Sequence, residues 1–174
     1  MDAERLPALA ALSGDDDVPI DAILAATASL LAAGGHRVAG VVQAETEGDG
    51  ECCATMTLTS LGDGRQTTIS QALGRSARGC RVDPQALAAV AGVLIDDVRS
   101  GADALIVNRF GKEESEGRGF RTVIEAAIER GIPTVVGIRA AHTEAWQDYS
   151  GGMTHWLEPD PARIADWIIA AGKM

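Results

Sequence analysis

Short apolar runs alternate with helix-like segments along most of this chain, and that alternation restricts the fold more than any other feature. The runs typical of buried strands lie at 8–12, 38–43, 104–107 and 133–138. Helical spacing of apolar residues follows at 20–33, after Asp83, at 123–128 and after Asp160. Asp83 and Asp160 each stand before a proline, which is the pattern of an N-cap followed by the first helical position. Strands alternating with helices predict a mainly parallel sheet covered on both faces.

The segment between the second strand and its following helix has a different pattern. Threonines alternate with apolar residues over 54–61, the turn 62–64 reads Gly-Asp-Gly, and 66–70 returns. This pattern predicts an antiparallel hairpin. A short helix at 143–149 and a last strand at 153–157 complete the expected order. We therefore predict one three-layer α/β domain over residues 1–174, with the hairpin extending a mainly parallel sheet.

The turn after the first strand stands where a nucleotide-binding protein of this order carries its phosphate-binding loop. A P-loop would read G-x-x-x-x-G-K-[ST], which cradles phosphates with backbone N–H groups and a lysine. This chain instead reads Ser-Gly-Asp-Asp-Asp-Val-Pro over 13–19. Three aspartates would repel a triphosphate. They are a residue type that holds Mg²⁺, but a solvated turn at a helix N-terminus is the commoner explanation for such a run. We expect no ordinary P-loop ATPase chemistry.

Composition narrows the function classes. The formal net charge of −10 argues against non-specific nucleic-acid binding and against attachment to an anionic membrane. No apolar run reaches the roughly 20 residues that span a bilayer, and the first residues lack the pattern of a signal peptide. The three cysteines are odd in number, and two are adjacent, which does not suit a secreted disulfide framework. These features predict a cytoplasmic protein with no membrane insertion.

Positive charge gathers in two segments of this acidic chain. Residues 64–82 contain four arginines and no acid, and residues 108–121 are expected to follow the central strand into a helix. Ligands of open α/β sheets bind beyond the carboxyl ends of strands, where helix N-termini and arginines favour an anion. The candidate anion-binding residues of the two segments are Arg75, Arg78, Arg81, Asn108, Arg109, Lys112, Arg118 and Arg121. The alternative for the second segment is a solvated turn with local ion pairs, because Glu113, Glu114 and Glu116 nearly cancel its charge.

The thiols offer a second chemistry. Cys52 and Cys53 begin the hairpin strand, and Cys80 lies beside Arg81. Thiolates bind soft metals, and a nearby arginine lowers the pKa of a thiol. No C-x-x-C or Cys/His zinc spacing accompanies them, so buried packing is the competing interpretation. His142 also lies near a strand end, where it either faces a ligand or begins a helix.

Three stretches together resemble a known but uncharacterised bacterial family of NTPase-like domains. They are 79–84 (Gly-Cys-Arg-Val-Asp-Pro), 107–112 (Val-Asn-Arg-Phe-Gly-Lys) with 116–119 (Glu-Gly-Arg-Gly), and 144–146 (Glu-Ala-Trp) followed by Gly151-Gly152. Members are often described as molybdenum ABC transporter ATP-binding proteins. The family is similar in turn to small P-loop nucleoside triphosphatases, which carry Asp-Glu-x-Gly where this chain has 108–111. The resemblance implies a P-loop-NTPase-like sheet without the P-loop, with Asn108 in place of the acid that holds Mg²⁺.

The expected function follows from these two sources. The residues predict a non-hydrolysing protein that binds an anionic ligand, either a nucleotide-containing cofactor or an oxyanion, and the resemblance implies molybdate as that oxyanion. The resemblance adds molybdenum handling, with molybdenum-pathway proteins or a second copy of the chain as partners. One alternative is an enzyme acting on a phosphorylated substrate or a nucleotide, with Lys112 as electrophile and one of the glutamates at 113–116 as base. Another is a regulatory subunit that binds only protein.

Overall fold

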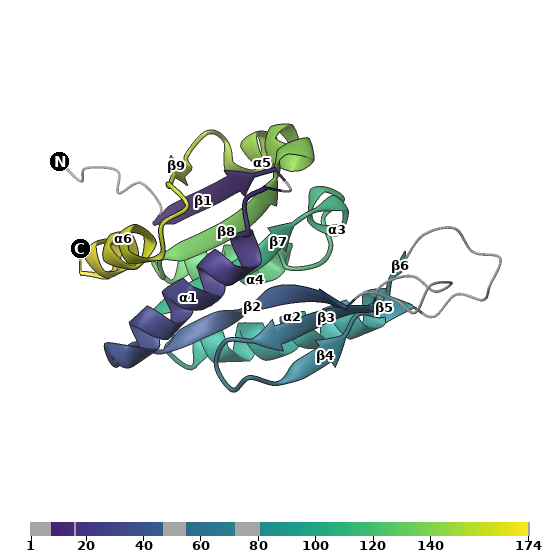
Figure 1. Cartoon of the computed structure of the whole chain (residues 1–174), viewed down its shortest axis with the longest axis horizontal. Helices are drawn as coiled ribbons and strands as arrows, with labels where there is room; N and C mark the ends of the chain where they lie inside the picture. Colours follow the sequence, from purple (N-terminus) through teal and green to yellow (C-terminus); the bar gives the residue numbers. More distant parts are fainter. Residues whose placement is uncertain (1–7, 16, 47–54, 72–80, 174) are drawn as a thin grey trace.

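A mainly parallel sheet with helices on both faces forms the body of the computed structural model, which describes residues 8–15, 17–46, 55–71 and 81–173 (Figure 1). Within these residues seven strands form one sheet in the order β4-β3-β2-β7-β8-β1-β9. Its strands are β1 (Leu9–Gly14), β2 (Val38–Thr46), β3 (Thr55–Ser60), β4 (Gln66–Thr68), β7 (Ala104–Phe110), β8 (Thr134–Arg139) and β9 (His155–Trp156). Strands β2, β7, β8, β1 and β9 pair in parallel, whereas β3 and β4 extend the sheet antiparallel. The predicted α/β class with a hairpin extension is confirmed.

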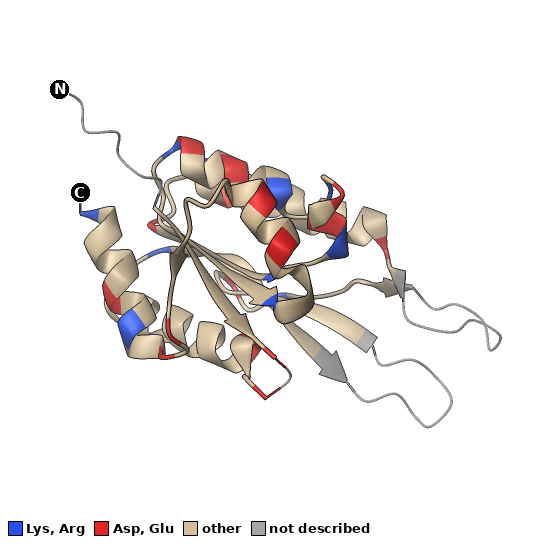
Figure 2. Cartoon of the chain, turned by 90° about the horizontal axis from the view of Figure 1, so that it is seen from above, with Lys and Arg blue, Asp and Glu red and all other residues tan. Residues whose placement is uncertain are grey.

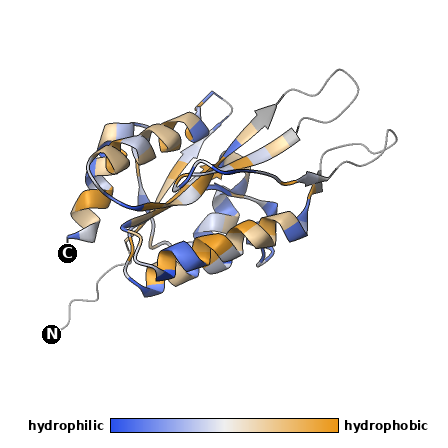
Figure 3. Ribbon diagram, turned by 90° about the horizontal axis from the view of Figure 1, so that it is seen from below, coloured by the Kyte–Doolittle hydropathy of each residue, from blue (hydrophilic) through white to orange (hydrophobic). Residues whose placement is uncertain are grey.

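The longer helices divide between the two faces of the sheet. Helices α1 (Ile20–Ala33) and α6 (Pro161–Gly172) pack on one face, and α2 (Pro84–Arg99) and α4 (Arg121–Glu129) on the other. Their buried apolar residues belong to the same core clusters as those of the strands, and apolar and polar positions are mixed along these helices in the hydropathy colouring (Figure 3). Shorter elements complete the described chain: β5 (Ser70–Gln71), β6 (Arg81–Val82), α3 (Lys112–Ser115), the 3₁₀ turn η1 (Ala140–His142) and α5 (Thr143–Ser150).

Local sequence signals account for several of these boundaries. The side chain of Asp83 accepts hydrogen bonds from the N–H groups of Gln85 and Ala86, and so caps α2. Asp160 caps α6 in the same way. Near the end of the sheet, α5 is fixed by Trp146, whose ring lies 5.1 Å from that of Phe110 in an edge-to-face contact.

The sequence prediction was wrong about the end of the central strand. Residues 108–121 were expected to form a loop, but β7 continues through Phe110 and α3 follows at once. Asn108 pairs with Gly137 of β8, and the register shifts before Phe110 pairs with Ile138. Polar Asn108 can be a buried strand residue because a side chain of α1 accepts its hydrogen bond, which is a contact between distant parts of the chain.

Acidic positions are distributed over several helices of the described chain rather than gathered on one of them (Figure 2). Among the described residues, no helix is both long and apolar enough to cross a membrane.

Candidate functional site

A cavity of about 630 Å³ opens at the carboxyl ends of β2, β7 and β8. It extends from there between the antiparallel hairpin and the first turn of α2. A volume of this size lies within the range of small-molecule sites, and the position agrees with the rule that ligands of α/β sheets bind beyond strand carboxyl ends. The cavity is lined by Gln43, Met56, Leu58, Ile69, Val82, Pro84, Leu87, Asn108, Arg109, Gly111, Lys112, Glu113, Glu114, Phe120, Arg139 and His142.

One set of lining residues, which we name the apolar wall, comes from the hairpin, β6, α2 and the residue that precedes α4. It consists of Met56, Leu58, Ile69, Val82, Leu87 and Phe120, which all belong to the hydrophobic core on the α2 face of the sheet. The strand period of two directs Met56 and Leu58 of β3 to the same face. The apolar wall therefore continues the core outward instead of closing over it.

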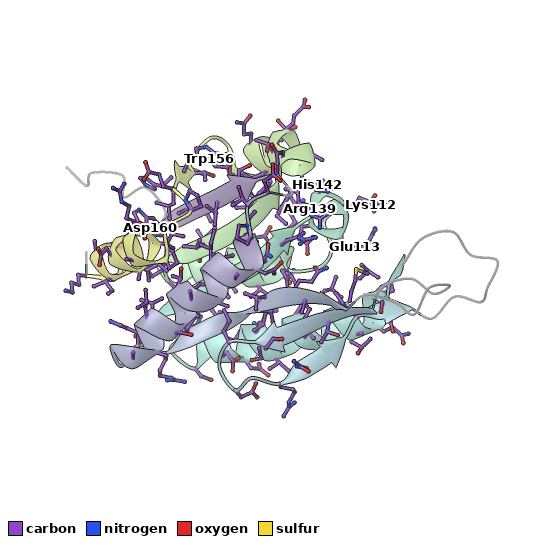
Figure 4. All side chains as sticks on the ribbon, in the orientation of Figure 1. Lys112, Glu113, Arg139, His142, Trp156 and Asp160 are labelled. Carbon is purple, nitrogen blue, oxygen red and sulfur yellow. The ribbon has the colours of Figure 1, made fainter. Side chains whose placement is uncertain are left out.

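A second set of lining residues, which we name the cationic wall, comes from the ends of β7 and β8 and the elements that follow them. It consists of Arg109, Lys112, Arg139 and His142. Lys112, Arg139 and His142 lie at one end of the sheet together with Glu113 (Figure 4). Guanidinium and ammonium groups gathered at one edge provide donors for carboxylate or phosphate oxygens.

Asp21, in the first turn of α1, organises the polar end of this site. Its Oδ1 accepts a hydrogen bond from the backbone N–H of Gln43 at 2.7 Å and another from the side-chain amide of Asn108. Its Oδ2 lies 3.5 Å from the guanidinium of Arg109. One carboxylate on α1 thus connects the ends of β2 and β7 and pairs with a member of the cationic wall.

The Asn108 side chain fits this arrangement tightly. It is 1% exposed, and its Oδ1 is a buried side-chain oxygen with no hydrogen-bond partner among the described residues. Gly137 on the neighbouring strand provides the necessary space: a Cβ at that position would overlap Asn108 Oδ1 and lie 2.9 Å from a methyl group of Ile20. Asn108 therefore contributes mainly the amide that holds Asp21 in place.

Glu114 holds the chain between β7 and α4 in shape. It is 4% exposed, and its two oxygens accept hydrogen bonds from the backbone N–H groups of Gly111 at 3.0 Å and Phe120 at 3.1 Å. Burial raises the pKa of Glu114, although these two bonds act in the opposite direction. Gly119 must lack a side chain here, because its Cβ would lie 2.8 Å from the Glu114 carboxyl carbon. The loop around Lys112 and Glu113 is therefore fixed by a buried carboxylate.

Two of the arginines expected to bind an anion, Arg118 and Arg121, are not among the lining residues of the cavity and have acidic partners close by in the chain. Arg118 bonds to Glu113 at 2.8 Å and also to Glu116, and its bond to Glu113 lowers the pKa of that carboxyl. Arg121 pairs with Glu125 at 3.4 Å and lies over the ring of Tyr149, 4.7 Å from its centre. For Arg118 and Arg121 the geometry is that of the alternative interpretation, a turn with local ion pairs. Arg109 and Lys112, in contrast, line the cavity.

Of the first arginine-containing segment, residues 64–82, only a part belongs to the described residues. Arg75, Arg78 and Cys80 lie outside the described residues, as do Cys52 and Cys53. The backbone of Arg81 is in β6, paired with Gln71, and adjoins Val82 of the apolar wall. Among the residues that are described, no group of three or more His, Cys, Asp and Glu side chains is placed to hold a metal ion. The predicted thiol–metal site therefore remains a prediction.

Sequence reasoning did not identify Asp21, Gln43 or Arg139 as site residues. Gln43 and Arg139 each directly follow a buried apolar run, so the position of a polar residue at a strand end was an available signal. Asp21 carried no such signal, because its role depends on contacts with β2 and β7. His142 lines the cavity and also precedes α5 as its N-cap residue.

The turn between β1 and α1 is not part of the cavity lining within the described chain. A P-loop would use that turn to hold phosphates. The cavity is instead lined by residues of β2, β7 and β8, and by residues of the hairpin and α2. Any ligand of this cavity would meet the cationic wall and the apolar wall, and not the acidic turn.

Comparisons with known proteins place these features in a family. The profile of a family described as "Protein of unknown function (DUF2478)" matches residues 9–167. A curated relative from Bradyrhizobium diazoefficiens (strain JCM 10833 / BCRC 13528 / IAM 13628 / NBRC 14792 / USDA 110), named "Molybdenum import ATP-binding protein ModC 2", is 31% identical over 167 residues. The alignment covers 96% of this chain but only 18% of that protein. No solved structure matches significantly. The chain therefore belongs to the DUF2478 family of proteins of unknown function.

Proposed function

We propose that this protein binds an organic anion with a flat apolar part, such as a nucleotide or a nucleotide-containing cofactor, without hydrolysing it. The observation that carries this proposal is the pairing of an apolar wall and a cationic wall in one cavity. A nucleobase gains from contact with side chains such as Leu58 and Phe120. A phosphate or carboxylate group gains from Arg109, Lys112 and Arg139.

The size of the cavity favours an organic anion over a bare oxyanion. Water takes up roughly 30 Å³ per molecule in the liquid, and a tetrahedral oxyanion such as molybdate is only a few times larger. Such an ion would contact the cationic wall and leave most of the 630 Å³ and the apolar wall unused. A nucleotide-sized ligand would contact both walls.

Two features support binding without hydrolysis. Phosphoryl transfer requires a phosphate cradle and an acid that positions Mg²⁺. The turn before α1 presents Asp15 and Asp17 in place of a cradle lysine. Asn108, which the family resemblance aligns with the Mg²⁺-binding acid, is a buried amide bonded to Asp21.

The relative's name supports a role in molybdenum handling. That name belongs to a protein of which this chain matches 18%, so the similarity does not assign ATP binding to this part. We propose that the chain acts in the cytoplasm as an anion-binding partner, or a fused part, of molybdenum-pathway proteins. A second copy of the chain remains a candidate partner.

An enzymatic role is the second candidate, and Glu114 is the observation that favours it. A carboxyl group of raised pKa beside Lys112 is a common feature of acid–base sites. Both Glu114 oxygens are already bonded to backbone N–H groups. A structural role accounts for the same burial, and we therefore place binding first.

The test is calorimetric titration with AMP, GMP, molybdate and phosphate. Lys112→Ala and Arg139→Ala should each weaken nucleotide binding by about 1.5–3 kcal/mol, the range for hydrogen bonds to charged groups. Arg163→Ala is the matched control, because it removes the same charge from α6, where Arg163 pairs with Glu158. If wild type binds none of these anions, the proposal is wrong and a protein partner becomes the leading function. If molybdate binds as tightly as the nucleotides, the proposal that the ligand has an organic part is wrong.

A further inference from the structure

Within the described chain, three carboxylates in or next to the cavity already accept hydrogen bonds from N–H donors. Glu114 accepts from two backbone N–H groups, and Glu113 accepts from Arg118. Asp21 accepts hydrogen bonds from the backbone N–H of Gln43 and the side-chain amide of Asn108. Its other oxygen pairs with the guanidinium of Arg109. Each of these acids thus already holds a protein group in place.

This arrangement is unfavourable for a bound Mg²⁺. Mg²⁺ in nucleotide sites is held by one or two carboxylates together with phosphate oxygens, in a strict octahedral geometry. A Mg²⁺ ion on Asp21 would either displace Arg109 from this carboxylate or place two positive groups against it. An ion on Glu114 would break the bonds that fix the loop between Gly111 and Phe120.

The charge of the lining residues also favours a ligand that binds without Mg²⁺. Arg109, Lys112 and Arg139 face the cavity together with the carboxylates of Glu113 and Glu114. The formal charge that these described lining residues offer to a ligand is therefore small. A nucleoside triphosphate needs a metal ion or many cations to neutralise its phosphates, whereas a monophosphate needs little more than one guanidinium and one ammonium group.

We infer that the cavity takes an anion of low charge, such as a nucleoside monophosphate, and binds it without a divalent cation. This inference rests on the proposed function and specifies its ligand class. Asp21 then acts as a positioning residue: it directs the Arg109 guanidinium and does not coordinate a metal.

The experiment measures dissociation constants of AMP, GMP, ATP and GTP by calorimetry, once in EDTA and once in magnesium chloride. The monophosphates should bind with the same affinity in both buffers, and the triphosphates should bind no more tightly than the monophosphates. A gain of about tenfold or more from magnesium, which is 1.4 kcal/mol, would overturn the inference while leaving nucleotide binding intact. Absence of binding for all four nucleotides in both buffers would instead refute the proposed function itself.

The variant Asp21→Asn tests the role of the carboxylate. Its amide oxygen can still accept from Gln43 and Asn108, but its NH₂ group would face the Arg109 guanidinium. Monophosphate binding should weaken by about tenfold, and by the same factor in EDTA and in magnesium. Asp166→Asn on the outer face of α6 should bind as wild type does. If Asp21→Asn removes only a magnesium-dependent part of the affinity, Asp21 is a metal ligand and the inference is wrong.

Discussion

The contact between Asn108 and Asp21 can be tested by changing one amide to an acid. Asn108 is the single asparagine of the chain, is 1% exposed and donates to Asp21 Oδ1. Asn108→Asp keeps the shape but places two carboxyl oxygens at hydrogen-bond distance. Two unit charges about 3 Å apart repel by about 5 kcal/mol at an effective dielectric constant of 20. The folded variant avoids this repulsion by keeping one proton on the pair.

The cost of keeping that proton gives the expected magnitude. An ordinary aspartate has a pKa of about 3.9, and holding its proton costs about 1.4 kcal/mol for each pH unit above that value, so protonation at pH 7 costs about 4 kcal/mol. Arg109 offsets part of this cost, and we expect a loss of about 3–4 kcal/mol in the free energy of unfolding at pH 7. Because the raised pKa belongs to the folded state, the loss should shrink by about 1.4 kcal/mol per pH unit as the pH falls toward 4.

Urea unfolding followed by circular dichroism at several pH values measures this dependence. Gln147→Glu is the matched control, since the same change on the exposed side of α5 should alter stability by less than about 0.5 kcal/mol. Adding Asp21→Asn to Asn108→Asp restores one amide and one acid, and should recover stability and remove the extra pH dependence. A difference between Asn108→Asp and wild type that does not vary with pH would show that residues 21 and 108 are not in contact.

Three further predictions concern the frame of the site and are checked by the same unfolding assay. Glu114→Ala leaves the N–H groups of Gly111 and Phe120 unpaired and should cost about 2–4 kcal/mol; because burial raises the pKa of Glu114 above its ordinary 4.5, this difference should shrink as pH rises through that raised value. Gly137→Ala should destabilise by about 1–3 kcal/mol through overlap with Asn108, whereas Gly92→Ala on α2, where a Cβ meets nothing within 4 Å, should be neutral or stabilising. Asp83→Ala removes the α2 cap and should cost about 1 kcal/mol, and an unchanged midpoint would contradict that role.

The sequence predicts elements well where the cause of an element is local. The helix expected at 20–33 has those bounds in the structure, because Pro19 precedes it and Gly34 follows it. The aspartate–proline pairs likewise mark the starts of α2 and α6. The end of β7 was missed because Asn108 and Arg109 look like loop residues until Asp21 is placed beside them. That contact joins residues 87 positions apart, and no local pattern contains it.

The residues of the candidate site could likewise be predicted from the sequence only where the signal was local. Clustered positive charge at the end of the central strand led to the prediction of Arg109 and Lys112 as anion-binding residues, and both line the cavity. Charge counting alone did not separate them from Arg118 and Arg121. Arg118 and Arg121 differ from Arg109 and Lys112 in their neighbours. They have acids two to five residues away in the chain, and their side chains bond to those acids. An arginine near such acids is a weaker candidate for ligand binding than its charge suggests.

The chemistry of Asp21 connects the acidic front of the chain to its proposed function. An acid in the first turn after β1 would weaken a phosphate site built there, since it opposes the attraction of helix N–H groups for an anion. In this protein that acid pairs with Arg109 and holds the ends of β2 and β7. The cationic side chains of Lys112 and Arg139 line the cavity beyond the ends of β7 and β8, together with the residues of the apolar wall. On this proposal, Asp21 weakens phosphate binding at the first turn of α1 and at the same time positions a cationic residue of the anion site at the neighbouring strand ends.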